Sequence, residues 1–256
     1  MQDVHHGAAD GFTAGAATYA QGRPDYPLDV DHWLRNDLAL GPGKTVLDLG
    51  AGTGKFIPRL RTTGAAVIAV DPVRAMLDQL TGLNPDIEAK EGSANAIPLA
   101  DNAVDAVVCA QAFHWFANRD ALAEIRRVLK PSGALGLIWN VRDERVGWVA
   151  ALSDLMGPFE GDTPRYHTGE WRRLFPADGF SPLLERHFPH GHTGAAERVI
   201  VDRILSVSFI AALPPADQAA LVTKIRTLIA TSPDLAGQDI VTFPYVTAAF
   251  HCRKTG

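Results

Sequence analysis

The stretch that decides the fold runs from Val46 to Gly54 and reads VLDLGAGTG. It begins as an apolar strand and continues into a loop whose glycines stand at positions 50, 52 and 54, where a helix opens. Glycine lets the backbone turn sharply and come close to a bound molecule, and the unpaired N–H groups at a helix start attract an anionic group. The stretch therefore predicts a ligand-binding loop at the end of a strand.

Short apolar runs and helical patterns alternate around this loop, from Gly43 to Asn140. Such alternation is typical of an α/β protein with a parallel sheet and crossover helices. The expected strands are Thr45–Leu49, Ala66–Val70, Val104–Ala110 and Leu135–Trp139, with a further short one near Ile87–Ala89. The expected helices are Lys55–Arg61, Pro72–Leu80 and Arg119–Leu129, each closed by glycine or by Lys-Pro-Ser-Gly.

The flanks of this unit are less regular. We expect one domain, residues 18–256, behind a flexible N-terminus of residues 1–17, with a cap and then a helix carrying Trp33 and Leu34 before the first strand. Residues 141–177 are expected to form an irregular or small helical insertion on the substrate side. Two further strands, Leu183–Phe188 and Val241–Cys252, are expected to follow, separated by helices near Glu197–Ala212 and Pro215–Thr231.

Composition narrows the class of protein. The 24 basic and 29 acidic residues give a formal charge of -5, which offers no field to attract nucleic acid. The two cysteines form no metal-binding spacing, the pair His5-His6 is not expected to bind metal, and no apolar run is long enough for a membrane helix. We expect a soluble, cytoplasmic protein without a membrane or metal partner, and the sequence predicts no oligomeric state.

Glycine spacing separates two cofactors that use such a loop. A dinucleotide fingerprint, G-x-G-x-x-G, needs its third glycine where this chain has the bulky Lys55. Asp48 also places an acid directly before the loop, which disfavours a pyrophosphate and favours a cofactor with an ammonium group. A nicotinamide-dependent oxidoreductase is therefore the less favoured alternative.

Asp48–Gly54 resembles the first motif of class I S-adenosylmethionine-dependent methyltransferases. Further ordered segments, which together cover about residues 18 to 140, resemble the same family: Val67–Asp71, Glu91–Leu99, Val104–Ala110 and Glu124–Gly133. Tyr19–Pro27 and Gln111–Phe116 resemble its type 11 subgroup, which includes small-carboxylate methyltransferases of the trans-aconitate kind. The resemblance implies a Rossmann-like sheet of seven strands with helices on both faces and an antiparallel last strand.

The resemblance also implies a set of S-adenosylmethionine-binding residues. Asp48 would lie near the methionine ammonium, and Asp71 would take the ribose hydroxyls, although Asp71 before Pro72 is also a good helix cap. Ser93 and the backbone of Ala94 would read the adenine edge, at a loop where many relatives carry Asp. The remaining expected contacts are Gly50, Ala51, Gly52, Thr53, Gly54, Pro72 and Gln111, with Tyr19 and Arg23 as a lid from the N-terminal side.

Two residues after the fourth expected strand are candidates for the catalytic side. His114 could orient the methyl acceptor or take its proton, and the alternative is a packed histidine between Phe113 and Trp115. Trp115 is expected to wall the pocket, since aromatic faces favour a sulfonium. Arginines that follow the fifth strand, at positions 142, 145, 165, 172 and 173, could present a cationic wall to a carboxylate or could lie on a solvated surface.

The sequence thus predicts an S-adenosylmethionine-dependent methyltransferase that acts on an oxygen or nitrogen of a small molecule, with a carboxylate as one candidate acceptor. Direct displacement at the methyl group needs in-line positioning and a dry pocket, and a general base is optional. Because no unique catalytic residue is required, a non-catalytic S-adenosylmethionine-binding module stays open as a second alternative.

Overall fold

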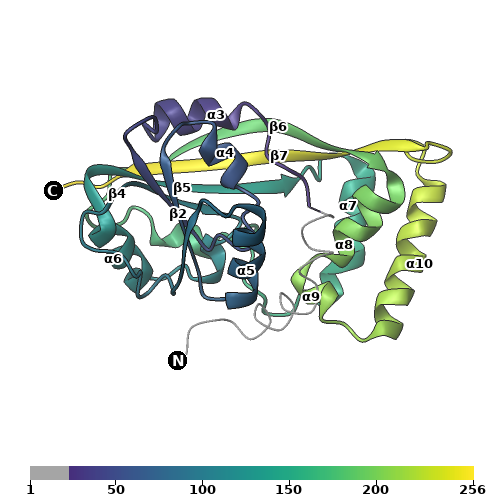
Figure 1. The fold of residues 1–256 in the computed structure, drawn as a ribbon. Coiled ribbons are helices and arrows are strands. Elements are labelled where there is room, and N and C mark those ends of the chain that lie inside the picture. The colour runs from purple at the N-terminus through teal and green to yellow at the C-terminus, as the bar shows by residue number, and fades with distance from the viewer. Residues whose placement is uncertain (1–22) are drawn as a thin grey trace.

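The computed structural model describes residues 23–256, which form a seven-stranded sheet with helices around it (Figure 1). The strand order is β3-β2-β1-β4-β5-β7-β6. The strands are β1 Thr45–Leu49, β2 Ala66–Asp71, β3 Glu88–Glu91, β4 Val104–Ala110, β5 Leu129–Arg142, β6 Leu184–Ala195 and β7 Ile240–Arg253. The predicted α/β architecture with seven strands is confirmed.

The central strands are parallel and buried because both faces of the sheet are covered. From β1 the chain moves outward to β2 and β3, and then returns to place β4 on the other side of β1. The loops that follow β1 and β4 therefore leave the sheet in opposite directions. This reversal opens a crevice at the carboxyl ends of the strands, where open α/β sheets bind ligands.

The last strand, β7, is antiparallel to both of its neighbours, as predicted. The β6–β7 pairing runs from Leu184 opposite His251 to Ala195 opposite Ile240, so β6 is about twice as long as its predicted range. Pro189 and nearby glycines obscured this strand in the sequence. Proline is tolerated there because β6 is an edge strand, whose outer side has no ladder to interrupt.

Helices cover the two faces of the sheet with separate apolar cores. On one face lie α3 Val30–His32, its π-helical continuation η1 Trp33–Asp37, α4 Ile57–Arg61 and α5 Arg74–Leu83. On the other lie α6 Arg119–Val128 and the short 3-10 helices η2 Phe113–Trp115 and η4 Glu170–Leu174. Asn118 caps α6 by accepting a hydrogen bond from the N–H of Ala121 at 2.8 Å.

A further group of helices packs against the half of β7 that extends away from the parallel strands (Figure 1). We call this group the helical cover; it consists of α7 Gly147–Met156, η3 Gly157–Phe159, η5 Glu197–Asp202, α8 Arg203–Leu205, α9 Ser208–Ala211 and α10 Pro215–Thr231. Its apolar core contains residues of α7, α10 and the first part of β7. Within residues 23–256, no helix combines the length and apolarity needed to cross a bilayer.

Several predicted bounds are wrong for local reasons. Helix α4 begins at Ile57, after the turns that close the glycine loop, and α5 begins at Arg74 because Pro72 lies in a bend before it. Strand β5 begins at Leu129, since that residue already pairs with Val104 before the register shifts.

The predicted helix near Glu197–Ala212 is in fact three short helices. The Ser206 hydroxyl donates to the carbonyl of Arg203 at 2.7 Å, and Val207 is extended, so the chain bends between α8 and α9. Such local bonding by serine competes with helix continuation. The bend leaves Arg203, Val207 and Ser208 beside a cavity.

Candidate active site

Two adjoining cavities lie at the carboxyl ends of the central strands. The first, which we call the loop cavity, is lined by residues that include Asp48, Gly50, Ala51, Gly52, Thr53, Lys55, Asp71, Pro72, Val73, Met76, Ala112 and Phe116. The second, the arginine cavity, is lined by residues that include His114, Trp139, Arg142, Glu144, Arg165, Tyr166, His167, Val207 and Ser208. Arg23, Gln111, Trp115, Asn140 and Arg203 line both.

The glycine loop wraps the loop cavity with backbone rather than side chains. Gly50 and Gly52 both have positive φ, +74° and +54°, which side chains disfavour. A Cβ at Gly50 would lie 2.7 Å from the Cβ of Ala112, whereas a Cβ at Gly52 would meet nothing within 4 Å. Gly50 is therefore needed for packing, and Gly52 leaves open space beside the cavity.

Asp48 is a buried acid that no hydrogen bond satisfies within residues 23–256. The side chain is 1% exposed, and neither carboxylate oxygen has a hydrogen-bond partner there. Burial, reinforced by the nearby charge of Asp71, raises the pKa of Asp48 to about 7. A buried carboxyl that lines a cavity and lacks a partner is suited to receive a cation.

Asp71 sits at the end of β2 with both oxygens engaged by backbone. One oxygen accepts from the N–H of Gly52 and the other from the N–H of Val73, each at 2.8 Å. Burial raises the pKa of Asp71, and the two backbone hydrogen bonds oppose that rise. Each carboxylate oxygen retains a further lone pair. Asp71 thus ties the glycine loop to the start of α5 and still offers acceptors to a ligand.

The structure brings together most of the residues predicted to bind the cofactor. Ala51, Thr53, Pro72, Gln111 and Arg23 all line the loop cavity. Gln111 has a positive φ of +58° and donates from its side chain to the carbonyl of Asn140 at 3.3 Å, which holds it at the boundary of the two cavities.

Three predicted contacts do not line the loop cavity, and one lies outside the described residues. A Cβ at Gly54 would contact Leu80, which places Gly54 against α5. Ser93 and Ala94 lie in the loop after β3, where Ala94 is buried in the core. Their role toward adenine stays a prediction, and Tyr19 precedes the first described residue.

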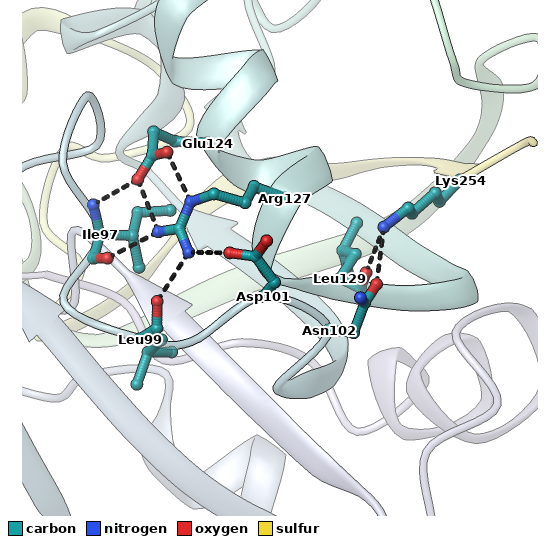
Figure 2. Close-up of polar contacts among 8 residues, drawn as sticks. All are labelled: Ile97, Leu99, Asp101, Asn102, Glu124, Arg127, Leu129 and Lys254. Carbon is teal, nitrogen blue, oxygen red and sulfur yellow. Dashed lines mark hydrogen bonds and ion pairs between the residues drawn. The ribbon is translucent and has the colours of Figure 1, made fainter.

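Figure 2 shows how the loop between β3 and β4 is anchored to α6. Arg127 donates to the carbonyls of Ile97 and Leu99 at 2.9 and 2.8 Å, and it pairs with Asp101 at 2.8 Å. Glu124 accepts from Arg127 at 2.7 Å and from the N–H of Ile97 at 2.9 Å. One guanidinium therefore fixes the conformation of the loop predicted to face adenine.

The arginine cavity contains cations that form no ion pair among the described residues: Arg142, Arg165 and Arg203. Burial lowers the pKa of Arg142, with a further contribution from Arg203. Burial and the charge of Arg142 lower the pKa of Arg165 to about 10, and its guanidinium lies 4.9 Å from the ring centre of Phe209. The cavity is therefore strongly electropositive.

Arg142 and Arg165 are among the five arginines that the sequence suggests for a cationic wall, and Arg203 is not. Arg203 comes from the helical cover, and no spacing relates it to Arg142 or to the glycine loop. The other predicted members of a cationic wall point elsewhere. Arg145, Arg172 and Arg173 pair with Asp143, Glu185 and Glu170.

His114 lies in η2, against β5. The indole N–H of Trp139 donates to Nδ1 of His114 at 3.0 Å, and the ring of Trp115 lies 5.2 Å from the imidazole. Burial, together with the charges of Arg165 and Arg23, lowers the pKa of His114 to about 3. At neutral pH the imidazole is therefore uncharged.

Comparison with known proteins places these features in a family. A type 11 family model described as "Methyltransferase domain" matches residues 47–137. An uncharacterized methyltransferase-like protein of Schizosaccharomyces pombe is 38% identical over 95% of this chain and 95% of its own length. An uncharacterized methyltransferase of Mycobacterium tuberculosis is 39% identical over 92% of each chain. The YcgJ protein of Bacillus subtilis has a similar fold, with a TM-score of 0.59 and 20% identity over 90% of this chain and 98% of that one.

Proposed function

The chain belongs to the S-adenosylmethionine-dependent methyltransferases, and we propose that it transfers the methyl group to a carboxylate oxygen of a small molecule. The loop cavity would hold the cofactor and the arginine cavity the acceptor. The residues they share, Gln111, Trp115, Asn140, Arg23 and Arg203, would then surround the point where the two molecules meet.

The residues of the loop cavity fit the two polar ends of S-adenosylmethionine. Asp48, whose two carboxylate oxygens accept no hydrogen bond from the described part of the chain, would face the methionine ammonium. Asp71 would accept hydrogen bonds from the ribose hydroxyls through its remaining lone pairs. The open space at Gly52 would let the backbone approach the bound molecule closely.

The proposed acceptor class rests on the set of largely buried arginines that have no carboxylate partner among residues 23–256. Taking such charges out of water is costly unless an anion compensates them, and a carboxylate pairs with guanidinium groups through two parallel hydrogen bonds. Arg23, Arg142, Arg165 and Arg203 bring four positive charges to the cavity, against the negative charges of Glu144 in its lining and of Glu160, which acts on Arg142 and Arg165. An anionic acceptor would relieve this excess, whereas a protonated amine would add to it.

The reaction asks little of the protein besides placement. S-adenosylmethionine supplies an electrophilic methyl group on a sulfonium, so a carboxylate oxygen in line with it displaces the sulfide without loss of a proton. The arginines would hold the carboxylate in that line, and Trp115 would wall the meeting point and exclude water. Residues 141–177 and the helices between β6 and β7 would together form the acceptor side.

A turnover panel tests this proposal. Release of S-adenosylhomocysteine is measured with trans-aconitate, benzoate, a catechol and a primary amine; trans-aconitate is included because Tyr19–Pro27 and Gln111–Phe116 resemble that subgroup. We expect turnover with at least one carboxylate and none with the amine. Turnover confined to the catechol or the amine would contradict the proposal.

A further inference from the structure

The contact between Trp139 and His114 determines which nitrogen of the imidazole carries the proton. An indole N–H can only donate, so Nδ1 of His114 must present a lone pair to it across their 3.0 Å contact. A neutral imidazole has one proton, which must then be on Nε2. The only basic lone pair of His114 is therefore already occupied by Trp139.

The indole of Trp139 is held in place by packing and cannot turn away from Nδ1 of His114. Its side chain is 1% exposed, and its ring centre lies 4.6 Å from that of Trp171, 5.0 Å from that of Tyr166 and 5.9 Å from that of Phe250. Turning the indole away would require this cluster to repack. Protonating Nδ1 would instead set two N–H donors against each other, and the resulting unmatched buried group is costly.

The other nitrogen of His114 is oriented by the same contact. The imidazole lines the arginine cavity together with Trp139, and no hydrogen bond of Nε2 is found among residues 23–256. The cavity's charged groups are Arg23, Arg142, Arg165 and Arg203 with Glu144, and the remaining titratable groups in its lining are Tyr166 and His167. An Nε2–H that reached an anion held by these arginines would complete the same kind of recognition.

We propose that Trp139 holds His114 as a hydrogen-bond donor to the acceptor's anionic group, so that His114 is not a general base and the site accepts only atoms that are already ionised. This inference rests on the proposed function and narrows its substrate class to carboxylates, excluding phenols, alcohols and amines that must lose a proton. Trp139 is then a positioning residue, acting through His114. The depressed pKa of His114 agrees with this geometry.

The tautomer can be read directly, without turnover. Histidine nitrogens in ¹⁵N-labelled protein, saturated with S-adenosylhomocysteine, are followed by NMR from pH 5 to 9, with His114→Gln used to identify the His114 signal. We expect the Nε2–H tautomer throughout. Trp139→Phe keeps the aromatic packing and removes the donor, so the His114 signal should change to a mixture of tautomers.

A matched control exists on the opposite face of the sheet. There the indole N–H of Trp33 donates to Nδ1 of His251 at 3.3 Å, and Trp33 is likewise 1% exposed. Trp33→Phe should alter the His251 signal and leave His114 unchanged. A wild-type His114 found as the Nδ1–H tautomer, or as an imidazolium near pH 6, would overturn the inference whatever the acceptor proves to be.

Two substitutions of His114 separate a donor from a base and do not depend on Trp139 variants folding. Gln donates through an amide in place of Nε2 but cannot act as a base near neutral pH, whereas Leu does neither. With trans-aconitate as the probe, His114→Leu should raise KM about tenfold, as for a lost hydrogen bond to a charged group, and His114→Gln, which restores a donor, should recover most of that loss.

The pH profile distinguishes the remaining outcomes. Between pH 6 and 8, we expect kcat/KM to depend on pH in the same way in the wild-type protein and in His114→Gln. A hundredfold loss of kcat in His114→Gln would show a general base and overturn the inference. If NMR finds the Nε2–H tautomer but no carboxylate is turned over, the proposed function and the substrate class fail together while the Trp139–His114 assignment stands.

Discussion

The loop cavity and the arginine cavity share a wall but are assembled differently. The loop cavity draws on the ends of β1, β2 and β4, and much of it comes from the single run between Asp48 and Phe56. The arginine cavity collects Arg23, Arg142, Arg165 and Arg203, which span 180 positions and include no two neighbours. A site built from backbone therefore leaves a local pattern in the sequence, whereas a site built from distant side chains is visible only once the chain has folded.

The two cavities also differ in the sign of their buried charge. The loop cavity contains Asp48 and Asp71, whose pKa values burial raises. The arginine cavity contains Arg142 and Arg165, whose pKa values burial lowers. Burial destabilises the charged form of each set of residues, and a ligand group of opposite charge would offset this cost. The site is therefore suited to a cationic group on one side and an anionic group on the other.

The largest effect should come from Gly52→Val. A branched side chain at this positive φ would project into the open space beside the loop cavity. It should lower the affinity for S-adenosylhomocysteine by more than about a hundredfold, roughly 3 kcal/mol. Calorimetry measures the affinity. Gly237→Val is the control, since Gly237 has φ +73° and an equally open Cβ position but lines neither cavity. Equal losses in both variants would mean that strain, not occupancy, causes the effect.

Asp48 and Asp71 should affect opposite ends of the cofactor. Asp71→Ala should weaken both S-adenosylhomocysteine and methylthioadenosine by about 1.5 to 3 kcal/mol, because both ligands contain the ribose. Asp48→Ala should weaken S-adenosylhomocysteine more, because methylthioadenosine lacks the ammonium group. Binding measurements in which Asp48→Ala weakens the two ligands equally would refute the assignment.

In the arginine cavity, Arg142→Met should raise KM for a carboxylate acceptor about tenfold to a hundredfold, as for a lost charged hydrogen bond, and leave cofactor affinity within about twofold. Arg145→Met is the neighbouring control, since Arg145 is exposed and paired with Asp143. Steady-state kinetics with each substrate varied separates the two affinities. Loss of cofactor affinity in Arg142→Met would show that the cavities are not functionally distinct.

Binding of S-adenosylhomocysteine should depend on pH through Asp48. This acid is protonated in the free protein below about pH 7, and it must ionise to pair with an ammonium group. Affinity should therefore rise by up to about tenfold per unit between pH 6 and 7 and level off above it, with release of a proton. Calorimetry in buffers of different ionisation enthalpy counts that proton, and Asp48→Asn should abolish both effects.

Stability of the free protein should show the opposite trend. The unfolded chain loses this proton near the ordinary value of 3.8, whereas the folded chain keeps it until about pH 7. Between these values the folded state binds more protons, so the free energy of unfolding should fall as pH rises, by at most about 1.4 kcal/mol per unit. Denaturant unfolding of wild type and Asp48→Asn, compared at pH 5 and 7, measures the difference.

The smallest effect should come from Arg127→Met, which releases the loop between β3 and β4 shown in Figure 2. Loss of these hydrogen bonds should cost about 1 to 2 kcal/mol of stability. The substitution should also lower the affinity for adenosine-containing ligands if Ser93 and Ala94 contact adenine. Arg119→Met, on the exposed start of α6, is the control. Unchanged ligand affinity in a destabilised Arg127→Met would remove that loop from the site.

The fold was largely predictable because burial repeats along the chain. Strands such as Val104–Ala110 are apolar on both faces apart from Asp105, and α10 has the bounds that its pattern predicts. The length of β6 was not predictable, because its pairing with β7 overrides the turn preferences of Pro189 and its neighbours. In the site, the glycine loop was predicted from local residues, whereas Arg203 and the hydrogen bond between Trp139 and His114 depend on contacts that no sequence spacing encodes.

Strand β7 passes through more than one core. Its first part, with Val241, Phe243 and Tyr245, belongs to the helical cover, and its last part, with Phe250 and Cys252, belongs to the core beneath α6. Residues 240–251 of β7 pair with β6, and residues 245–253 pair with β5. Amide hydrogen exchange should therefore find continuous protection along β7. Because β7 belongs to both cores, it should also limit how far the helical cover unfolds independently of the sheet.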